Sequence, residues 1–159
     1  MLLNRDEISG YQAEIEAVGE AFFGDATASF IKYIIGNTNN SESHRRVFVR
    51  IAGSRVVAFL ILSTVLDESE ILQVAVKKEC QRCGLAAALL DEVFDFCRKS
   101  GISKIFLEVR EGNFPARSLY KKFEFEEAGL RRDYYENPRE NAVVMSKNLS
   151  VSGAEKPKK

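Results

Sequence analysis

The chain of 159 residues has no tryptophan, one histidine and three cysteines. An odd cysteine count does not make a disulfide framework, so we expect a reduced, cytoplasmic protein. Cys80 and Cys83 form a C-x-x-C pair, but a zinc site needs about four ligands and His44 is distant in sequence. We therefore predict no metal site and interpret the pair as incidental, with a redox role as the alternative.

Net charge is also absent, because 23 basic residues balance 23 acidic ones. A nucleic-acid-binding protein is usually basic, so we expect no nucleic-acid partner. No apolar run approaches the ~20 residues of a membrane span, and the start lacks the features of a signal peptide. We expect a monomer or weak dimer with a single domain over residues 1–149, followed by a disordered tail over 150–159.

Hydrophobic spacing predicts a mixed α/β chain without internal repeats. In the first half we expect a helix over 6–23, a second over 26–35, a polar loop over 37–46, a hairpin of 47–51 and 56–65, and a strand over 70–76. In the second half we expect an amphipathic helix that ends at Ser100-Gly101, an apolar strand over 102–109 typical of a buried position, a short helix capped by Asn113, and a hairpin of 125–135 and 142–149.

Two widespread phosphate loops, G-x-x-x-x-G-K-S/T and G-x-G-x-x-G, are absent. Instead, a strand ending at Val76 leads through Gln81-Arg82-Cys83-Gly84-Leu85-Ala86 into the amphipathic helix. A short loop that opens a helix directs free backbone N–H groups at one point, where the helix dipole adds positive charge. Small residues let an anion approach the backbone closely. The segment predicts a pyrophosphate site, and an ordinary strand-to-helix loop is the alternative.

Glu108 lies near the end of an apolar strand, beside Ile105, Phe106 and Leu107. A carboxylate in such a place costs free energy unless it is paired or used in chemistry. Glu108 is therefore a candidate general base. The alternative is a salt bridge to Arg110 or to another arginine.

The loop from Gln81 to Ala86 resembles the acyl-CoA loop, Gln/Arg-x-x-Gly-x-Gly/Ala, of the GNAT superfamily of N-acetyltransferases. Further motifs are similar to one branch of it, the bacterial ribosomal-protein-alanine N-acetyltransferases, over about residues 70–149. These motifs are Leu107-Glu108-Val109-Arg110, Asn113, Ala116, Leu119-Tyr120, Phe125, Arg131-Arg132-Asp133-Tyr134-Tyr135 and Asn141-Ala142-Val143-Val144-Met145.

Several positions depart from the pattern of that branch. Glu124 replaces a glycine before Phe125, Asn141 replaces an aspartate, and Cys80 stands where an aromatic residue is common. The first half of the chain matches poorly. These departures bear on the acceptor substrate more than on the reaction.

The resemblance implies the GNAT fold, with a mixed central sheet, an antiparallel meander, a βαβ core that binds acetyl-CoA and a C-terminal hairpin. It implies acetyl-CoA as co-substrate, without a metal. It also implies direct transfer of acetyl to the N-terminal α-amine of a protein, with the N-terminal alanine of a small-subunit ribosomal protein as the expected acceptor.

The resemblance also assigns roles to residues. An α-amine has a pKa of about 8 and must lose a proton before attack, which is the role implied for Glu108. Tyr120 would protonate the departing thiolate, unless it is a core tyrosine. The expected acetyl-CoA contacts are the backbone of Val74, Ala75 and Val76, then Arg82, Cys83, Gly84, Leu85, Ala86, Ala87 and Asn113. Arg131, Tyr134 and Tyr135 are expected to contact the acceptor substrate. The alternative is that they belong to a solvated hairpin without a role in binding.

Two other functions stay open from the sequence. The same chemistry could act on a lysine side chain, a polyamine, an amino acid or an antibiotic. A non-catalytic acyl-CoA-binding module is the second alternative.

Overall fold

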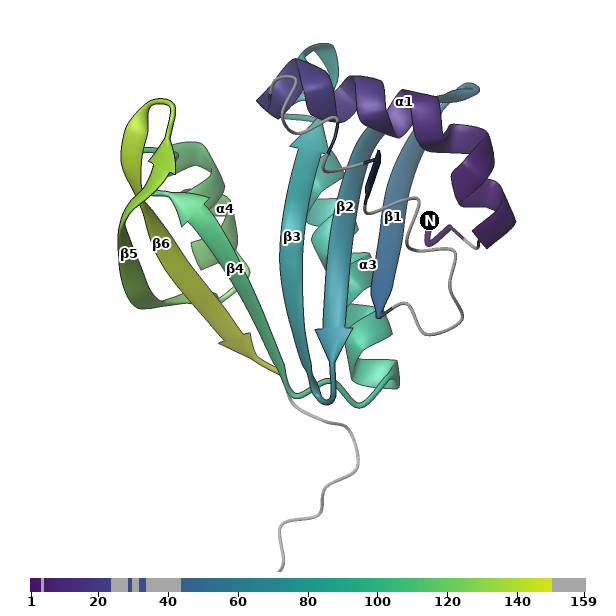
Figure 1. The fold of residues 1–159 in the computed structure, drawn as a ribbon. Helices are drawn as coiled ribbons and strands as arrows, with labels where there is room; N and C mark the ends of the chain where they lie inside the picture. Colours follow the sequence, from purple (N-terminus) through teal and green to yellow (C-terminus); the bar gives the residue numbers. More distant parts are fainter. Residues whose placement is uncertain (4, 24–28, 30–31, 34–43, 150–159) are drawn as a thin grey trace, which may run out of the picture. The chain divides into compact units, whose positions relative to one another are not determined.

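The computed structural model describes residues 1–3, 5–23, 29, 32–33 and 44–149 (Figure 1). The chain divides into an N-terminal unit, residues 1–64 and 71–93, and a C-terminal unit, residues 65–70 and 94–159. Most of the helix predicted over 26–35, residues 37–43 of the predicted loop and the predicted tail over 150–159 lie outside the described residues. The single domain stays a prediction.

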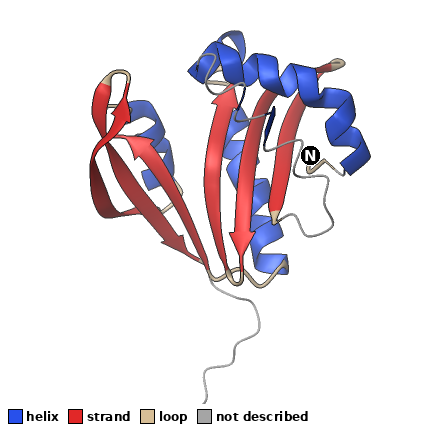
Figure 2. Cartoon of the chain, in the orientation of Figure 1, coloured by secondary structure: helices blue, strands red, loops and turns tan. Residues whose placement is uncertain are grey.

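The N-terminal unit contains strands in the order β1-β2-β3 (Figure 2), which are β1 (Arg45–Ala52), β2 (Arg55–Val65) and β3 (Glu68–Val76). The last residue of β2 and the first three residues of β3, Glu70 included, belong to the C-terminal unit. Strands β1 and β2 pair antiparallel, with Val47 opposite Ile61. Gly53 turns the chain between them at a φ of 62°, which favours glycine. The predicted hairpin and third strand are confirmed.

Two helices cover these strands. In Figure 1, α1 (Arg5–Phe23) crosses in front of them and α3 (Leu85–Lys99) runs behind. The core on the α1 side combines residues of α1 and the chain before it with strand residues: Leu3, Ile8, Ile15, Val18, Val47, Val49, Phe59 and Ile61. Burial of β2 is almost continuous because both of its faces are covered.

The C-terminal unit contains an antiparallel sheet in the order β4-β6-β5, formed by β4 (Lys104–Arg110), β5 (Glu126–Glu136) and β6 (Arg139–Asn148). The predicted hairpin is confirmed as β5 and β6. Strand β4 begins two residues later than predicted, because α3 ends through Gly101, at a φ of 73°, and the N–H of Ile102 bonds the carbonyl of Cys97 at 2.9 Å.

Burial alternates along β4, which corrects the expectation of an apolar strand typical of a buried position. Ile105, Leu107 and Val109 are buried, whereas Glu108 and its neighbours two residues away are half-buried. A period of two places Glu108 and Arg110 on one face of the sheet. Arg110 and Arg131 both pair with Ala142 of β6, so Arg131 shares that face. This register positions the candidate site.

Candidate active site

The loop before α3 consists of a 3-10 turn over Lys78–Cys80 and two positions in the left-handed region, Arg82 at a φ of 61° and Gly84 at 76°. The first helical hydrogen bond of α3 joins the N–H of Ala88 to the carbonyl of Gly84 at 2.9 Å. The N–H groups of residues 85–87 precede that bond, so the helix itself offers them no acceptor.

The loop residues fit an anionic group. A Cβ placed on Gly84 would meet no atom within 4 Å, so space beside the loop is open. Arg82 is exposed, and Cys83 is exposed with a free thiol. Gln81 stabilises the loop by donating from its side-chain amide to the carbonyl of Val76 at 3.3 Å. Free N–H groups, a helix dipole and an exposed arginine together suit a pyrophosphate.

Pairing with β2 determines the direction in which the backbone N–H groups of β3 point. The N–H of Lys77 donates to the carbonyl of Val57 at 2.8 Å. Successive N–H groups of a strand point to opposite sides, so those of Val74 and Val76 point away from β2. The side chain of Ala75 is buried. This part of β3 therefore has backbone donors on the side away from β2, and their contact with acetyl-CoA stays a prediction.

Glu108 is paired with an arginine from β5. Its Oε1 lies 2.6 Å from the Nε of Arg131, and the Glu108 side chain is only 16% exposed. The hydroxyl of Tyr134 donates a hydrogen bond to the same carboxylate, which is the main reason that the pKa of Tyr134 is raised. The salt bridge considered from the sequence therefore exists, with Arg131 as the partner rather than Arg110.

A second carboxylate, Glu70, lies close to this pair and was missed by sequence reasoning. Its pKa is raised by burial and then by the negative charge of Glu108, while Arg131 opposes the shift. The charge of Arg131 thus acts on both carboxylates, although its ion pair is with Glu108. Glu70 and Glu108 come from different strands, and no motif links them, so only the folded chain shows their proximity.

Tyr120 is fixed by both ends of α4 (Phe114–Lys122). At the start, Asn113 Oδ1 accepts from the N–H of Ala116 at 3.2 Å. At the end, the N–H of Phe125 bonds the carbonyl of Tyr120 at 3.0 Å, and the rings of these two residues pack edge to face at 5.7 Å. Glu124 adopts a φ of 62°, so the turn that usually requires glycine is kept despite the substitution.

The hydroxyl of Tyr120 remains protonated at neutral pH. The residue is 8% exposed, and burial, followed by the nearby Tyr135, raises its pKa to about 12. A buried phenol in this state is a proton donor. The structure therefore places a neutral donor in the same unit as the Glu108 carboxylate.

The two tyrosines of β5 are placed by an irregular segment of that strand, where Asp133 has a φ of 52°. Asn141 Oδ1 accepts from the N–H of Asp133 at 2.9 Å, while its Nδ2 donates to Glu111 at 2.9 Å. An aspartate could accept the first bond but could not donate the second. Asn141, which stands where the ribosomal-protein-alanine N-acetyltransferase motif has an aspartate, therefore stabilises the segment that leads to Tyr134 and Tyr135.

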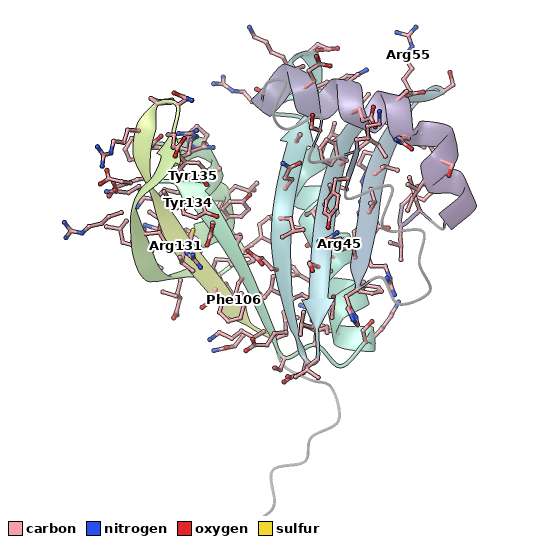
Figure 3. The ribbon with its side chains drawn as sticks, viewed as in Figure 1. Arg45, Arg55, Phe106, Arg131, Tyr134 and Tyr135 are labelled. Atoms are coloured by element: carbon pink, nitrogen blue, oxygen red, sulfur yellow. The ribbon has the colours of Figure 1, made fainter. Side chains whose placement is uncertain are left out.

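Figure 3 shows Arg131, Tyr134 and Tyr135 on the hairpin of the C-terminal unit. The rings of the two tyrosines meet edge to face at 5.1 Å, and the guanidinium of Arg110 lies 4.0 Å from the Tyr135 ring. The structure thus brings the predicted residues together in two sets. The predicted loop and β3 backbone belong to the N-terminal unit, and the C-terminal unit holds Glu108, Asn113, Tyr120, Arg131, Tyr134 and Tyr135.

Comparison with known proteins identifies the class. The acetyltransferase (GNAT) family matches residues 11–125, more than half of the chain. The chain belongs to this family and is an acetyl-CoA-dependent N-acetyltransferase.

Two curated relatives with the same named activity are similar to this chain. Ribosomal protein bS18-alanine N-acetyltransferase of Haemophilus influenzae is 35% identical over 123 residues, which are 75% of this chain and 84% of that protein. Its counterpart in Escherichia coli strain K12 is 39% identical over 99 residues, 61% of this chain and 67% of that protein.

A solved structure supports the same comparison. The crystal structure of the ribosomal-protein-S18-alanine N-acetyltransferase from Escherichia coli matches with a TM-score of 0.78 and 30% identity, and the match covers 98% of this chain and 97% of that one. The expected mixed α/β GNAT fold is confirmed.

Within the described part of the chain, no helix is long and apolar enough to cross a membrane. Among the same residues, no group of three or more histidine, cysteine, aspartate or glutamate side chains could hold a metal ion.

Proposed function

We propose that this chain acetylates the N-terminal α-amine of a protein, and that the N-terminal alanine of a small-subunit ribosomal protein is its acceptor. The observation that carries this proposal is the presence, in one unit, of a half-buried carboxylate, Glu108, and a neutral buried phenol, Tyr120. The named activity of the curated relatives from Haemophilus influenzae and Escherichia coli supports the choice of acceptor.

The loop of residues 82–87 holds the pyrophosphate of acetyl-CoA through its backbone N–H groups, and the molecule supplies an acetyl thioester. Asn113 is already used as the cap of α4, so its amide nitrogen is the part left for a contact to this co-substrate. The N–H of Val76, which points away from β2, is the donor we assign to the carbonyl oxygen of the acetyl group.

Glu108 accepts a proton from the α-ammonium, directly or through a water, and leaves a neutral amine. That amine attacks the acetyl carbon, the new C–N bond forms and the C–S bond breaks. Tyr120 donates its proton to the departing thiolate, and the second proton that the attacking nitrogen must lose passes to water and restores the Tyr120 phenol. An α-ammonium, with a pKa of about 8, gives up its proton more readily than a lysine, with a pKa of about 10.4. The chemistry therefore favours the N-terminus as acceptor.

The test is release of free thiol from acetyl-CoA with two peptides. One peptide has a free N-terminal alanine and no lysine, and the other has a blocked N-terminus and one internal lysine. Turnover on the first alone is expected. Turnover on the lysine peptide alone, or on neither, contradicts the proposed acceptor and directs the search to small amines.

A further inference from the structure

The Glu108 carboxylate is occupied by a cation from its own chain. Arg131 Nε lies 2.6 Å from Glu108 Oε1, and the guanidinium carbon lies 5.5 Å from the centre of the Tyr134 ring. The Tyr134 hydroxyl also donates to Glu108. A carboxylate beside an aromatic face is a site that binds cations of several shapes, ammonium included.

Arg131 is weakly held in that place, in contrast to Arg110 on the same face. Arg110 bonds the carboxylate of Glu140 and the carbonyls of Asn137 and Pro138, and only 34% of its side chain is exposed. The Arg131 side chain is 59% exposed, and Glu108 is its one ion-pair partner among the described residues. Partly exposed pairs of this kind contribute little free energy, so a competing cation can replace the guanidinium.

The substrate brings such a cation. The α-amine of the acceptor arrives mostly protonated, and its proton must reach Glu108, which Arg131 occupies. From this geometry we infer that Arg131 is a latch: its guanidinium fills the cation subsite formed by Glu108 and Tyr134, and the acceptor's ammonium displaces it. The inference rests on the proposed function, and it makes Arg131 a competitor of the acceptor rather than a contact to it.

Removing the guanidinium of Arg131 distinguishes a competitor of the acceptor from a residue that binds the acceptor. In Arg131→Ala we expect the KM for the free-N-terminus peptide to fall roughly two- to fivefold, with kcat much less affected, because the acceptor no longer competes with a weak ion pair. Millimolar methylguanidinium, compared with sodium at equal ionic strength, should compete with the peptide in this variant. The matched control is Arg132→Ala, which removes a neighbouring exposed charge and should leave KM unchanged. A raised KM in Arg131→Ala, or an unchanged KM without competition, overturns the latch.

A second measurement does not require turnover. The Nε–H resonance of Arg131, assigned by its loss in Arg131→Ala, should move towards that of free arginine when the wild-type protein is titrated with alaninamide. N-acetylalaninamide, which has no ammonium, should leave it in place. An unmoved resonance overturns the latch even if peptides are acetylated. A moved resonance with no peptide turnover keeps the latch and contradicts the proposed acceptor.

Discussion

The loop before α3 and the cluster around Glu108 differ in the groups that they offer to a ligand, which are backbone groups in the loop and side chains in the cluster. The loop offers backbone N–H groups whose direction depends on the left-handed conformations of Arg82 and Gly84. The cluster uses side chains of β4 and β5, where Glu108 interacts with Arg131 and Tyr134. A backbone site tolerates changes of side chain but not of φ, whereas a side-chain cluster loses its chemistry when one functional group is removed.

The largest effect is expected for Glu108→Gln. The amide cannot accept the proton of the acceptor, so kcat should fall by about 100-fold or more while acetyl-CoA affinity stays nearly unchanged. Thiol-release kinetics and equilibrium binding of acetyl-CoA measure the two quantities. Glu126→Gln, on an exposed position of β5, is the matched control. A wild-type rate in Glu108→Gln would remove the base from the account.

Tyr120→Phe should lower kcat about tenfold. The effect is smaller because a thiol has a pKa near 8.5 and its thiolate leaves with little help. The ring contact to Phe125 remains, so the thermal midpoint should change little. With a pKa of about 12, the phenol should cause no loss of activity between pH 7 and 10. Tyr11→Phe in the N-terminal unit is the control, and equal rates for both variants would reject the donor role.

Sequence reasoning succeeded where the determinants are local. The segment Gln81 to Ala86 and the cap at Asn113 each lie within a few residues, so their conformations follow from short-range rules. The pairing of Arg131 with Glu108 depends on the register of β5, β6 and β4, and β5 has two register irregularities. Glu70 joins the cluster through tertiary structure alone. Spacing in the sequence does not encode such contacts.

Gly84→Ala should raise the KM for acetyl-CoA a few-fold and lower the stability by about 1 kcal/mol, because alanine is strained at a φ of 76°. Gly101→Ala is a matched control, since it has a φ of 73° and equally open surroundings at the other end of α3. We expect it to cost similar stability without changing that KM. Equal effects on KM would mean that strain, and not the anion site, explains Gly84.

The smallest effect concerns pH. The N–H of Gly112 and then the Arg110 guanidinium lower the pKa of Glu140 from its usual value of 4.5. A carboxylate with a lowered folded-state pKa stabilises the fold above its unfolded pKa, and this contribution is lost as the pH falls through the folded value. Glu140→Gln should therefore be slightly less stable than the wild type at pH 7, with a gap that narrows below about pH 4.5. Thermal unfolding of both proteins at pH 7 and pH 3 measures this difference in stability. A difference that does not change with pH would contradict a lowered pKa of Glu140.

The most direct test of the whole account uses one peptide with both a free N-terminal alanine and an internal lysine. After incubation with acetyl-CoA and the protein, tandem mass spectrometry locates the added acetyl group. The account predicts the acetyl group on the N-terminal nitrogen and an unmodified lysine. Acetyl on the lysine nitrogen, with a free N-terminus, would contradict it.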